Sequence, residues 1–91
     1  MYKLVLTQQA AKDATKSEQA GLKPKVVSLL HILKENPFQN PPPYEKLKGL
    51  DSTYSRRINR QHRLVYQLLP SDGGTSFKGV IKIIRMWTHY E

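Results

Sequence analysis

Four prolines within a short passage divide this chain into two parts. They are Pro37, Pro41, Pro42 and Pro43, in the stretch NPFQNPPPYEKLKGL. Proline fixes φ and lacks a backbone N–H, so this passage can neither continue a helix nor form a central strand. We therefore expect an ordered or semi-rigid connector, which brings the residues that follow it next to the second part of the chain.

The part before the prolines has the pattern of one strand and two helices. Residues 2–7 (YKLVLT) alternate and are rich in strand formers. Residues 8–20 contain alanines and no helix breaker, and Gly21 then predicts a helix end. In residues 23–36 the apolar positions recur at the spacing of an amphipathic helix. His31 lies on that helix, and we expect it to pack at the helix boundary or to face solvent.

The part after the prolines predicts a three-strand antiparallel meander. Residues 52–58 (STYSRRI) and 62–69 (HRLVYQLL) have the pattern of two strands joined by a tight turn. Residues 70–76 (PSDGGTS) predict a hairpin loop, and residues 77–90 predict a long final strand. The order of these elements predicts an α+β fold in which both helices pack on one face of the sheet.

Length and composition agree with one soluble globular domain that spans residues 1–91. Hydrophobic residues make up 38% of the chain and charged residues 24%. No apolar run approaches the roughly 20 residues that a membrane span requires, and the first residues lack the features of a signal peptide. The chain has no cysteine, so disulfides and thiolate metal sites are excluded, and we expect a cytoplasmic protein.

The charge of the chain is strongly positive and unevenly distributed. Fifteen Lys and Arg residues against seven Asp and Glu give a formal charge of +8. Between Lys46 and Arg63 there are six cations and a single acid, Asp51. Such a field attracts phosphate backbones, acidic proteins or anionic lipid, although a solvated basic face is also compatible with it.

Several short motifs resemble one family of proteins when they are taken together. The pairs PF and YEKLKGL, then SRRI, HRLVY and a terminal HY, occur here in that order. This combination closely resembles the YoeB/Txe branch of the RelE superfamily, which are the toxins of bacterial toxin–antitoxin pairs. The resemblance covers roughly residues 36–90, and the strand and two helices before it agree in order and length. It implies a RelE-like fold, similar to that of microbial RNases.

The resemblance also implies an activity, a ribosome-dependent endonuclease that cuts mRNA in the ribosomal A site without a metal or cofactor. A ribose 2′-OH would attack the adjacent phosphate and leave a 2′,3′-cyclic phosphate and a 5′-OH end. By motif position, Glu45 would be the base, Arg63 would hold the scissile phosphate, and His89 would be the acid. The residues implied to bind substrate are Lys48, Arg57 and Tyr90.

Two of these positions have alternatives. Neighbouring residues of a strand point to opposite faces, so only one of Arg56 and Arg57 can line the cleft. The resemblance favours Arg57, and we expect Arg56 to face ribosomal RNA or solvent. Glu45 has a purely structural alternative, a loop salt bridge to Lys46 or Lys48.

One histidine near the turn and the last residues of the chain also belong to, or depart from, the family pattern. His62 belongs to the family pattern, but we expect it to be structural because it lies near the turn. Trp87 is expected to pack, and it occupies a position where the family commonly has a basic residue. Tyr90 would stack on a base, or it is simply a terminal aromatic. The branch usually ends at HY, whereas this chain adds Glu91, which would lie beside His89.

The implied partners are a cognate antitoxin, the ribosome and mRNA. The family's antitoxins are often acidic and partly disordered, as in the YefM/Axe type, and a chain with a charge of +8 suits such a partner. We expect no membrane partner, and a homodimer is an open possibility. Three other interpretations remain. They are a poison of DNA gyrase with the same fold, a non-catalytic nucleic-acid-binding module, and an inactive descendant that binds an antitoxin.

Overall fold

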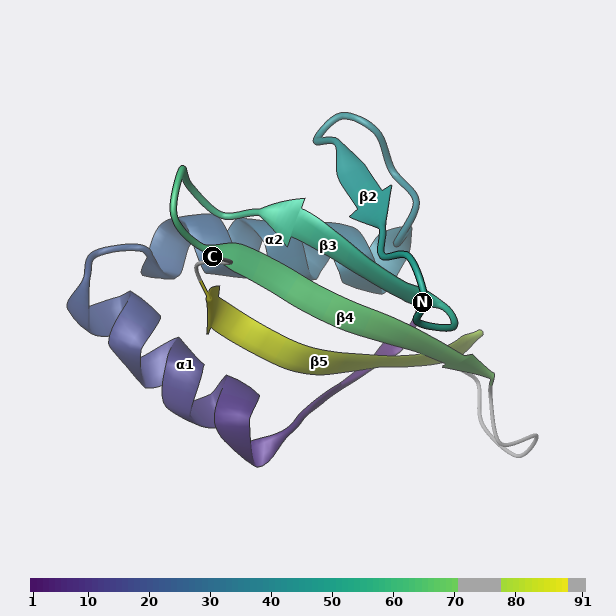
Figure 1. The fold of residues 1–91 in the computed structure, drawn as a ribbon, viewed down its shortest axis with the longest axis horizontal. Helices are drawn as coiled ribbons and strands as arrows, with labels where there is room; N and C mark the ends of the chain where they lie inside the picture. The colour runs from purple at the N-terminus through teal and green to yellow at the C-terminus, as the bar shows by residue number, and fades with distance from the viewer. Residues whose placement is uncertain (71–77, 89–91) are drawn as a thin grey trace.

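The computed structural model of the chain describes residues 1–70 and 78–88. Within them, two helices and five strands follow one another along the chain (Figure 1). Their bounds are β1 Lys3–Leu6, α1 Gln8–Gln19, α2 Lys23–Glu35, β2 Tyr44–Lys46, β3 Thr53–Arg57, β4 Arg63–Pro70 and β5 Gly79–Thr88. None of the helices in these two ranges is long and apolar enough to span a membrane.

The five strands form one mixed sheet in the order β1-β5-β4-β3-β2. The pairs β2–β3, β3–β4 and β4–β5 are antiparallel, whereas β1 pairs with β5 in parallel. The connection between these parallel strands is long and carries both helices as well as β2, β3 and β4. The sheet therefore has the short strands β1 and β2 at its two edges.

Local signals explain where the helices begin and end. The Thr7 hydroxyl accepts a hydrogen bond from the N–H of Ala10 and so caps α1. The chain then turns through Gly21, whose φ of 77° is readily adopted by glycine. Pro24 lies in the first turn of α2, where a missing N–H costs little. Residues Pro37 to Pro43 follow α2 and prevent the helix from continuing.

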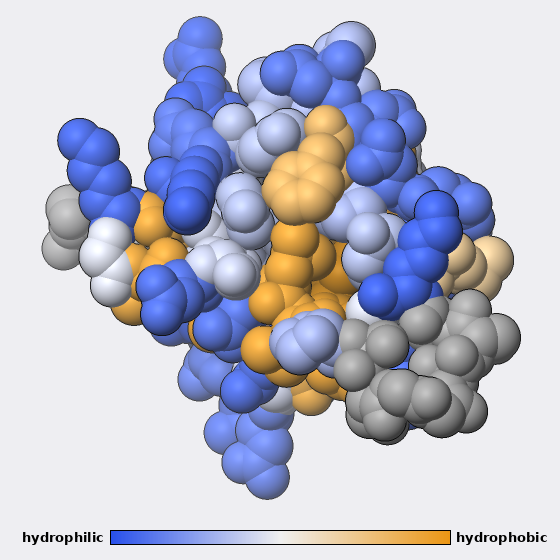
Figure 2. All heavy atoms as spheres, turned by 90° about the vertical axis from the view of Figure 1, so that its right-hand side faces the viewer, coloured by the Kyte–Doolittle hydropathy of each residue, from blue (hydrophilic) through white to orange (hydrophobic). Residues whose placement is uncertain are grey.

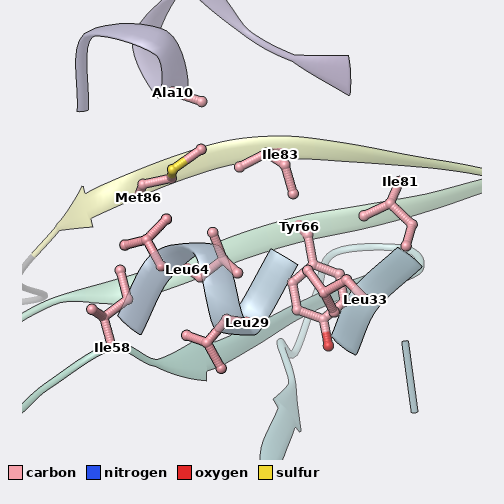
Figure 3. Close-up of a cluster of buried hydrophobic side chains, with 10 residues drawn as sticks. Ala10, Leu29, Leu33, Ile58, Leu64, Tyr66, Ile81, Ile83 and Met86 are labelled. Atoms are coloured by element: carbon pink, nitrogen blue, oxygen red, sulfur yellow. The ribbon is translucent and has the colours of Figure 1, made fainter. Parts of the chain in front are cut away.

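Both helices pack against the same row of side chains on the sheet. Figure 3 shows this buried cluster, which lies between α1, α2 and the central strands. Its members from α1 and α2 are Ala10, Val26, Leu29 and Leu33, and those from the sheet and the β3–β4 turn are Ile58, Leu64, Tyr66, Ile81, Ile83 and Met86. Alternation along β4 places Leu64 and Tyr66 on this face and Val65, which is not a member of the cluster, on the opposite face.

The second half of β5 departs from regular alternation. The pairing of β4 with β5 shifts on either side of Val65, which is typical of a β-bulge. As a result Ile83 and Met86, three residues apart, both reach the core. Asp13 of α1 accepts hydrogen bonds here from the Met86 N–H at 3.1 Å and from the Arg85 Nε at 2.9 Å.

Asp13 is fully buried, and its ionisation depends on these contacts. Burial raises the pKa of its carboxyl group, but hydrogen bonds from the Gln9 side chain, the Met86 N–H and Arg85 outweigh burial, so the pKa lies below its usual value. The charged carboxylate thus joins α1 to the irregular part of β5.

The predicted α+β fold, with two helices on one face of an antiparallel meander, is confirmed. Two features were not predicted. The first strand pairs in parallel with β5, and the end of the proline-rich connector forms β2. Residues 44–46 contain no proline and can pair at the sheet edge as soon as Pro43 has been passed. The predicted hairpin loop at 70–76 lies almost entirely outside the described residues.

Candidate active site

Strand alternation collects polar side chains on the sheet face opposite the helices. Glu45 of β2 pairs with Ser55 of β3, and Arg57 of β3 pairs with Arg63 of β4. Paired residues in an antiparallel sheet share a face, and residues two apart on one strand do so as well. Glu45, Ser55, Arg57 and Arg63 therefore lie together, and we call this group the cleft face.

Arg63 and Glu45 form an ion pair on the cleft face. The Arg63 Nη1 lies 3.6 Å from the Glu45 Oε2 and donates a hydrogen bond to the Ser55 Oγ at 3.2 Å. The Glu45 side chain is 68% exposed, whereas that of Arg63 is 27% exposed. An ion pair of this length and exposure contributes little to stability, so a ligand can displace it at low cost.

The cleft face forms the floor and walls of a hollow of about 260 Å³. Its lining includes Pro43, Glu45, Ser55, Arg57 and Arg63. An adjoining hollow of about 250 Å³ shares three of these residues and adds Leu47. Two guanidinium groups and one accessible carboxylate thus face the same space, which can hold an anion next to a proton acceptor.

A larger hollow, about 530 Å³ in volume, lies on the loop after β2. It is lined by residues 46–51, among them Lys46 and Lys48. Lys48 therefore adjoins the cleft face through the loop but is not part of the lining that Glu45 and Arg63 share. Over residues 1–70 and 78–88, no group of three His, Cys, Asp or Glu side chains could hold a metal ion.

The structure contradicts the prediction for Arg56. We expected it to face ribosomal RNA or solvent, but it is 1% exposed and lies on the helix-facing side of the sheet. Its guanidinium group donates hydrogen bonds to the backbone carbonyls of Pro37, Gln39 and Pro42. The alternation argument separated Arg56 and Arg57 correctly. It failed because the connector covers the side chain of Arg56, and a sequence pattern cannot show that covering.

The surface around the core is largely hydrophilic. On the side of the molecule shown in Figure 2, hydrophilic residues surround a narrow hydrophobic strip. Large hydrophobic residues that are exposed in the structure include Met1, Phe38, Leu50 and Leu69. The hydrophilic residues on this side agree with the excess of Lys and Arg in the sequence.

Comparison with protein families decides where the chain belongs. A family model described as a YoeB-like toxin of a bacterial type II toxin–antitoxin system matches residues 7–90. The chain belongs to this family. The match includes every element of the fold except the first strand, as well as the whole cleft face of this YoeB-like toxin. No curated protein matches its sequence.

Solved structures of related toxins have the same fold. The YoeB/ParE toxin from Agrobacterium tumefaciens is 31% identical, with a TM-score of 0.80, and the match covers 97% of this chain and 99% of that one. A YoeB dimer from Staphylococcus aureus is 32% identical, with a TM-score of 0.76 and 98% coverage of both chains. YoeB in a heterotetrameric YoeB–YefM complex from the same organism is also 32% identical, with a TM-score of 0.74 and 99% coverage of both.

The residues predicted for the site fall into three groups in this YoeB-like toxin. Glu45, Arg63 and Arg57 lie together on the cleft face, whereas Lys48 lines the neighbouring hollow. His89 and Tyr90 lie outside the described residues, as do Glu91 and the side chain of Trp87. The ion pair of Glu45 is formed with Arg63, and not with Lys46 or Lys48 as the structural alternative proposed.

Sequence reasoning missed Ser55. It is buried, pairs with Glu45 across the sheet and accepts a hydrogen bond from Arg63. The alternation that places Arg57 in the cleft also places Ser55 there, because it lies two residues earlier on the same strand. His62 is buried at the turn, where its backbone carbonyl accepts hydrogen bonds from Ile58 and Asn59.

Proposed function

We propose that this toxin is a ribosome-dependent endoribonuclease that cleaves mRNA in the A site and so inhibits translation. The observation that carries the proposal is the approach of Glu45 to Arg63, 3.6 Å apart in a hollow that Arg57 also lines. A proton acceptor and two phosphate-binding groups suit the attack of a ribose 2′-OH on its neighbouring phosphate.

In the proposed reaction, Glu45 accepts the proton of the 2′-OH while the ribose 2′-oxygen forms a bond to phosphorus. Arg63 holds the phosphate and stabilises the negative charge that develops on its oxygens. Both contacts of Arg63 in the structure involve Nη1. A guanidinium group carries five donors on three nitrogens, so the other donors of Arg63 are left for the phosphate. The bond to the 5′-oxygen breaks, His89 protonates that oxygen, and a 2′,3′-cyclic phosphate remains.

The other predicted residues would position the RNA. Arg57 shares the hollow with Arg63 and would bind the flanking phosphate, while Lys48 would bind backbone from the adjoining loop. Tyr90 would stack on a base, which tolerates any base identity. Because these contacts are mainly to phosphate, we expect association with the ribosome to weaken strongly as salt increases.

We also propose that the chain binds a cognate antitoxin, which is acidic and partly disordered before binding. The Staphylococcus aureus relative forms a heterotetrameric complex with YefM, and that relative also forms a dimer. The formal charge of +8 favours an acidic partner, which would cover the cationic cleft. Because ribosomes are its proposed target, the toxin would act in the cytoplasm. A measurement of its mass in solution would show whether it forms a homodimer, as that relative does.

The test is cleavage of mRNA on programmed ribosomes by the purified toxin, with the 5′ ends mapped to the nucleotide. We expect cuts inside the A-site codon that leave 5′-OH ends, and slower cleavage of naked mRNA. Arg63→Ala should abolish the cuts on the ribosome and any cleavage of naked mRNA. Cleavage of naked RNA at the same rate would remove the ribosome as an obligate partner. Absence of cleavage, with inhibition of DNA gyrase in a parallel supercoiling assay, would favour the gyrase alternative. Binding of RNA without either effect would favour a binding module.

A further inference from the structure

Arg56 is the buried member of the adjacent arginine pair. It is 1% exposed, and within the described ranges of the chain it forms no ion pair with a carboxylate. A buried charge without a counter-ion is costly unless hydrogen bonds replace the water that it loses. Its position therefore calls for an explanation beyond filling space in the sheet.

Arg56 donates its hydrogen bonds to backbone carbonyls of the proline-rich connector, contacts Tyr44 of β2, and also interacts with the Tyr66 side chain of β4. Its Nη1 donates to the Pro42 carbonyl at 2.6 Å, and its Nη2 donates to the Pro37 and Gln39 carbonyls at 2.9 Å each. The guanidinium carbon lies 5.2 Å from the centre of the Tyr44 ring, in a cation–π arrangement. One side chain thus holds four points of the segment that leads to Glu45.

That segment is otherwise held by a short strand and by ring contacts, in which Phe38 and Tyr44 pack edge to face on each other and on Tyr54 of β3. β2 has three residues, lies at the edge of the sheet and pairs with β3 alone. Tyr44 is the partner of Arg56 in the β2–β3 ladder, and Glu45 is the next residue, on the opposite face. The contacts of Arg56 with Pro42 and Tyr44 on the helix-facing side therefore help to fix the position of the Glu45 carboxylate on the cleft face.

We propose that Arg56 is a positioning residue for the reaction, which holds Glu45 at its distance from Arg63 by fixing the connector and β2. The inference rests on the proposed function, because it assigns Glu45 the role of base. A shift of about 1 Å between reacting groups can cost 100-fold in rate, so a clamp outside the cleft can control catalysis.

The chain offers a matched control for this proposal. The Tyr66 hydroxyl donates a hydrogen bond to the Pro37 carbonyl at 3.2 Å, which is also an acceptor for Arg56. Tyr66→Phe removes this hydrogen bond at the far end of the connector, together with the interaction between the Tyr66 hydroxyl and Arg56, but it keeps the Arg56 contacts to Pro42 and to the Tyr44 ring. If Arg56 contributed to stability alone, Arg56→Lys and Tyr66→Phe would have the same kcat per folded molecule.

The experiment compares these two variants with the unmodified toxin on programmed ribosomes. Lysine keeps the charge but lacks the fork that reaches several carbonyls. For Arg56→Lys we expect kcat per folded molecule to fall about 10- to 100-fold, with KM changed less than about twofold because the charge is kept. For Tyr66→Phe we expect a lower Tm, with kcat within about twofold of the unmodified toxin. Equal kcat values for the two variants would overturn the proposal.

A second measurement does not depend on activity. Amide hydrogen exchange reports opening of the β2–β3 pairing, including the hydrogen bond from the Leu47 N–H to the Thr53 carbonyl. We expect faster exchange at β2 in Arg56→Lys than in Tyr66→Phe, and equal exchange would contradict the clamp. If the unmodified toxin fails to cleave, the proposed function fails, whereas the exchange data still decide whether Arg56 holds β2.

Discussion

The two faces of the sheet are built from the same strands but carry different side chains, hydrophobic on one face and polar on the other. On the helix-facing side, Leu64 and Ile83 of the sheet pack with Leu33 of α2 in one hydrophobic cluster, and all three are fully buried. The opposite side, at the β2 end, holds an exposed carboxylate and two arginines around a hollow. One residue step along a strand therefore separates a side chain of the buried core from one that faces the hollow. Variants in the hydrophobic cluster should therefore change unfolding, and variants on the cleft face should change the reaction. Arg56 is the exception, because it lies on the helix-facing side and is proposed to position Glu45.

The largest effect on the helix-facing side is expected for Leu33→Ala. This side chain is fully buried, and its truncation removes apolar contacts and leaves a cavity that the surroundings only partly fill. We expect the free energy of unfolding to fall by about 2 to 5 kcal/mol, measured by urea denaturation. Cleavage per folded molecule should be unchanged. Val27→Ala, at an exposed position of the same helix, is the control and should cost less than about 0.5 kcal/mol.

On the cleft face, Arg63→Ala should have the converse effect. Loss of the group that stabilises the developing phosphate charge should slow cleavage about 10²- to 10³-fold. Its ion pair with Glu45 is partly exposed, so the free energy of unfolding should change by less than about 1 kcal/mol. Arg60→Ala removes the same charge from an exposed turn position and should cleave almost normally. A similar loss in both variants would mean that net charge, and not the cleft, controls the rate.

Asp13→Asn tests a polar contact on the helix-facing side. The substitution removes the charge that accepts hydrogen bonds from Arg85 and the Met86 N–H, and should destabilise the fold at pH 7 by about 1 to 3 kcal/mol. Because the folded-state pKa of Asp13 is lowered, its contribution is complete above the unfolded-state pKa of about 3.9 and is lost as the pH falls through the folded-state pKa. The difference between variant and unmodified toxin should therefore close in acid. A difference that is constant from pH 7 to pH 2 would contradict this.

The smallest effect is expected for Ser55→Ala. Its hydroxyl accepts one hydrogen bond from Arg63 at 3.2 Å, and a net loss of about 1 kcal/mol corresponds to roughly fivefold slower cleavage. Ser28→Ala, at an exposed position of α2, is the control. If Ser55→Ala slows cleavage as much as Arg63→Ala, the hydroxyl must act on the substrate directly and not through Arg63.

Most of the fold could be predicted from the sequence because its elements follow hydrophobic periodicity. The helix predicted at 8–20 is observed as Gln8–Gln19, and that at 23–36 as Lys23–Glu35. Both reflect amphipathic or breaker-free stretches. The parallel pairing of β1 with β5 and the bulge in β5 could not be predicted, because they depend on long-range contacts such as those of Asp13.

The candidate site was predictable only where a motif and an alternation coincide. Together they separated Arg57 from Arg56 and indicated Glu45 and Arg63 as neighbours. They could not show what covers the far side of β3, so the burial of Arg56 under the connector was missed. Ser55 was missed for a different reason, since a lone serine in a strand carries no signal of its own.

The central claim is that Glu45, on the cleft face, is the base of the reaction. The most direct test is the single-turnover rate of mRNA cleavage on programmed ribosomes by Glu45→Gln, with Glu35→Gln, at the exposed end of α2, as the control. We expect a rate at least about 100-fold lower for Glu45→Gln, with ribosome binding and unfolding unchanged and with the control at the normal rate. Cleavage by Glu45→Gln at the rate of the unmodified toxin would contradict it.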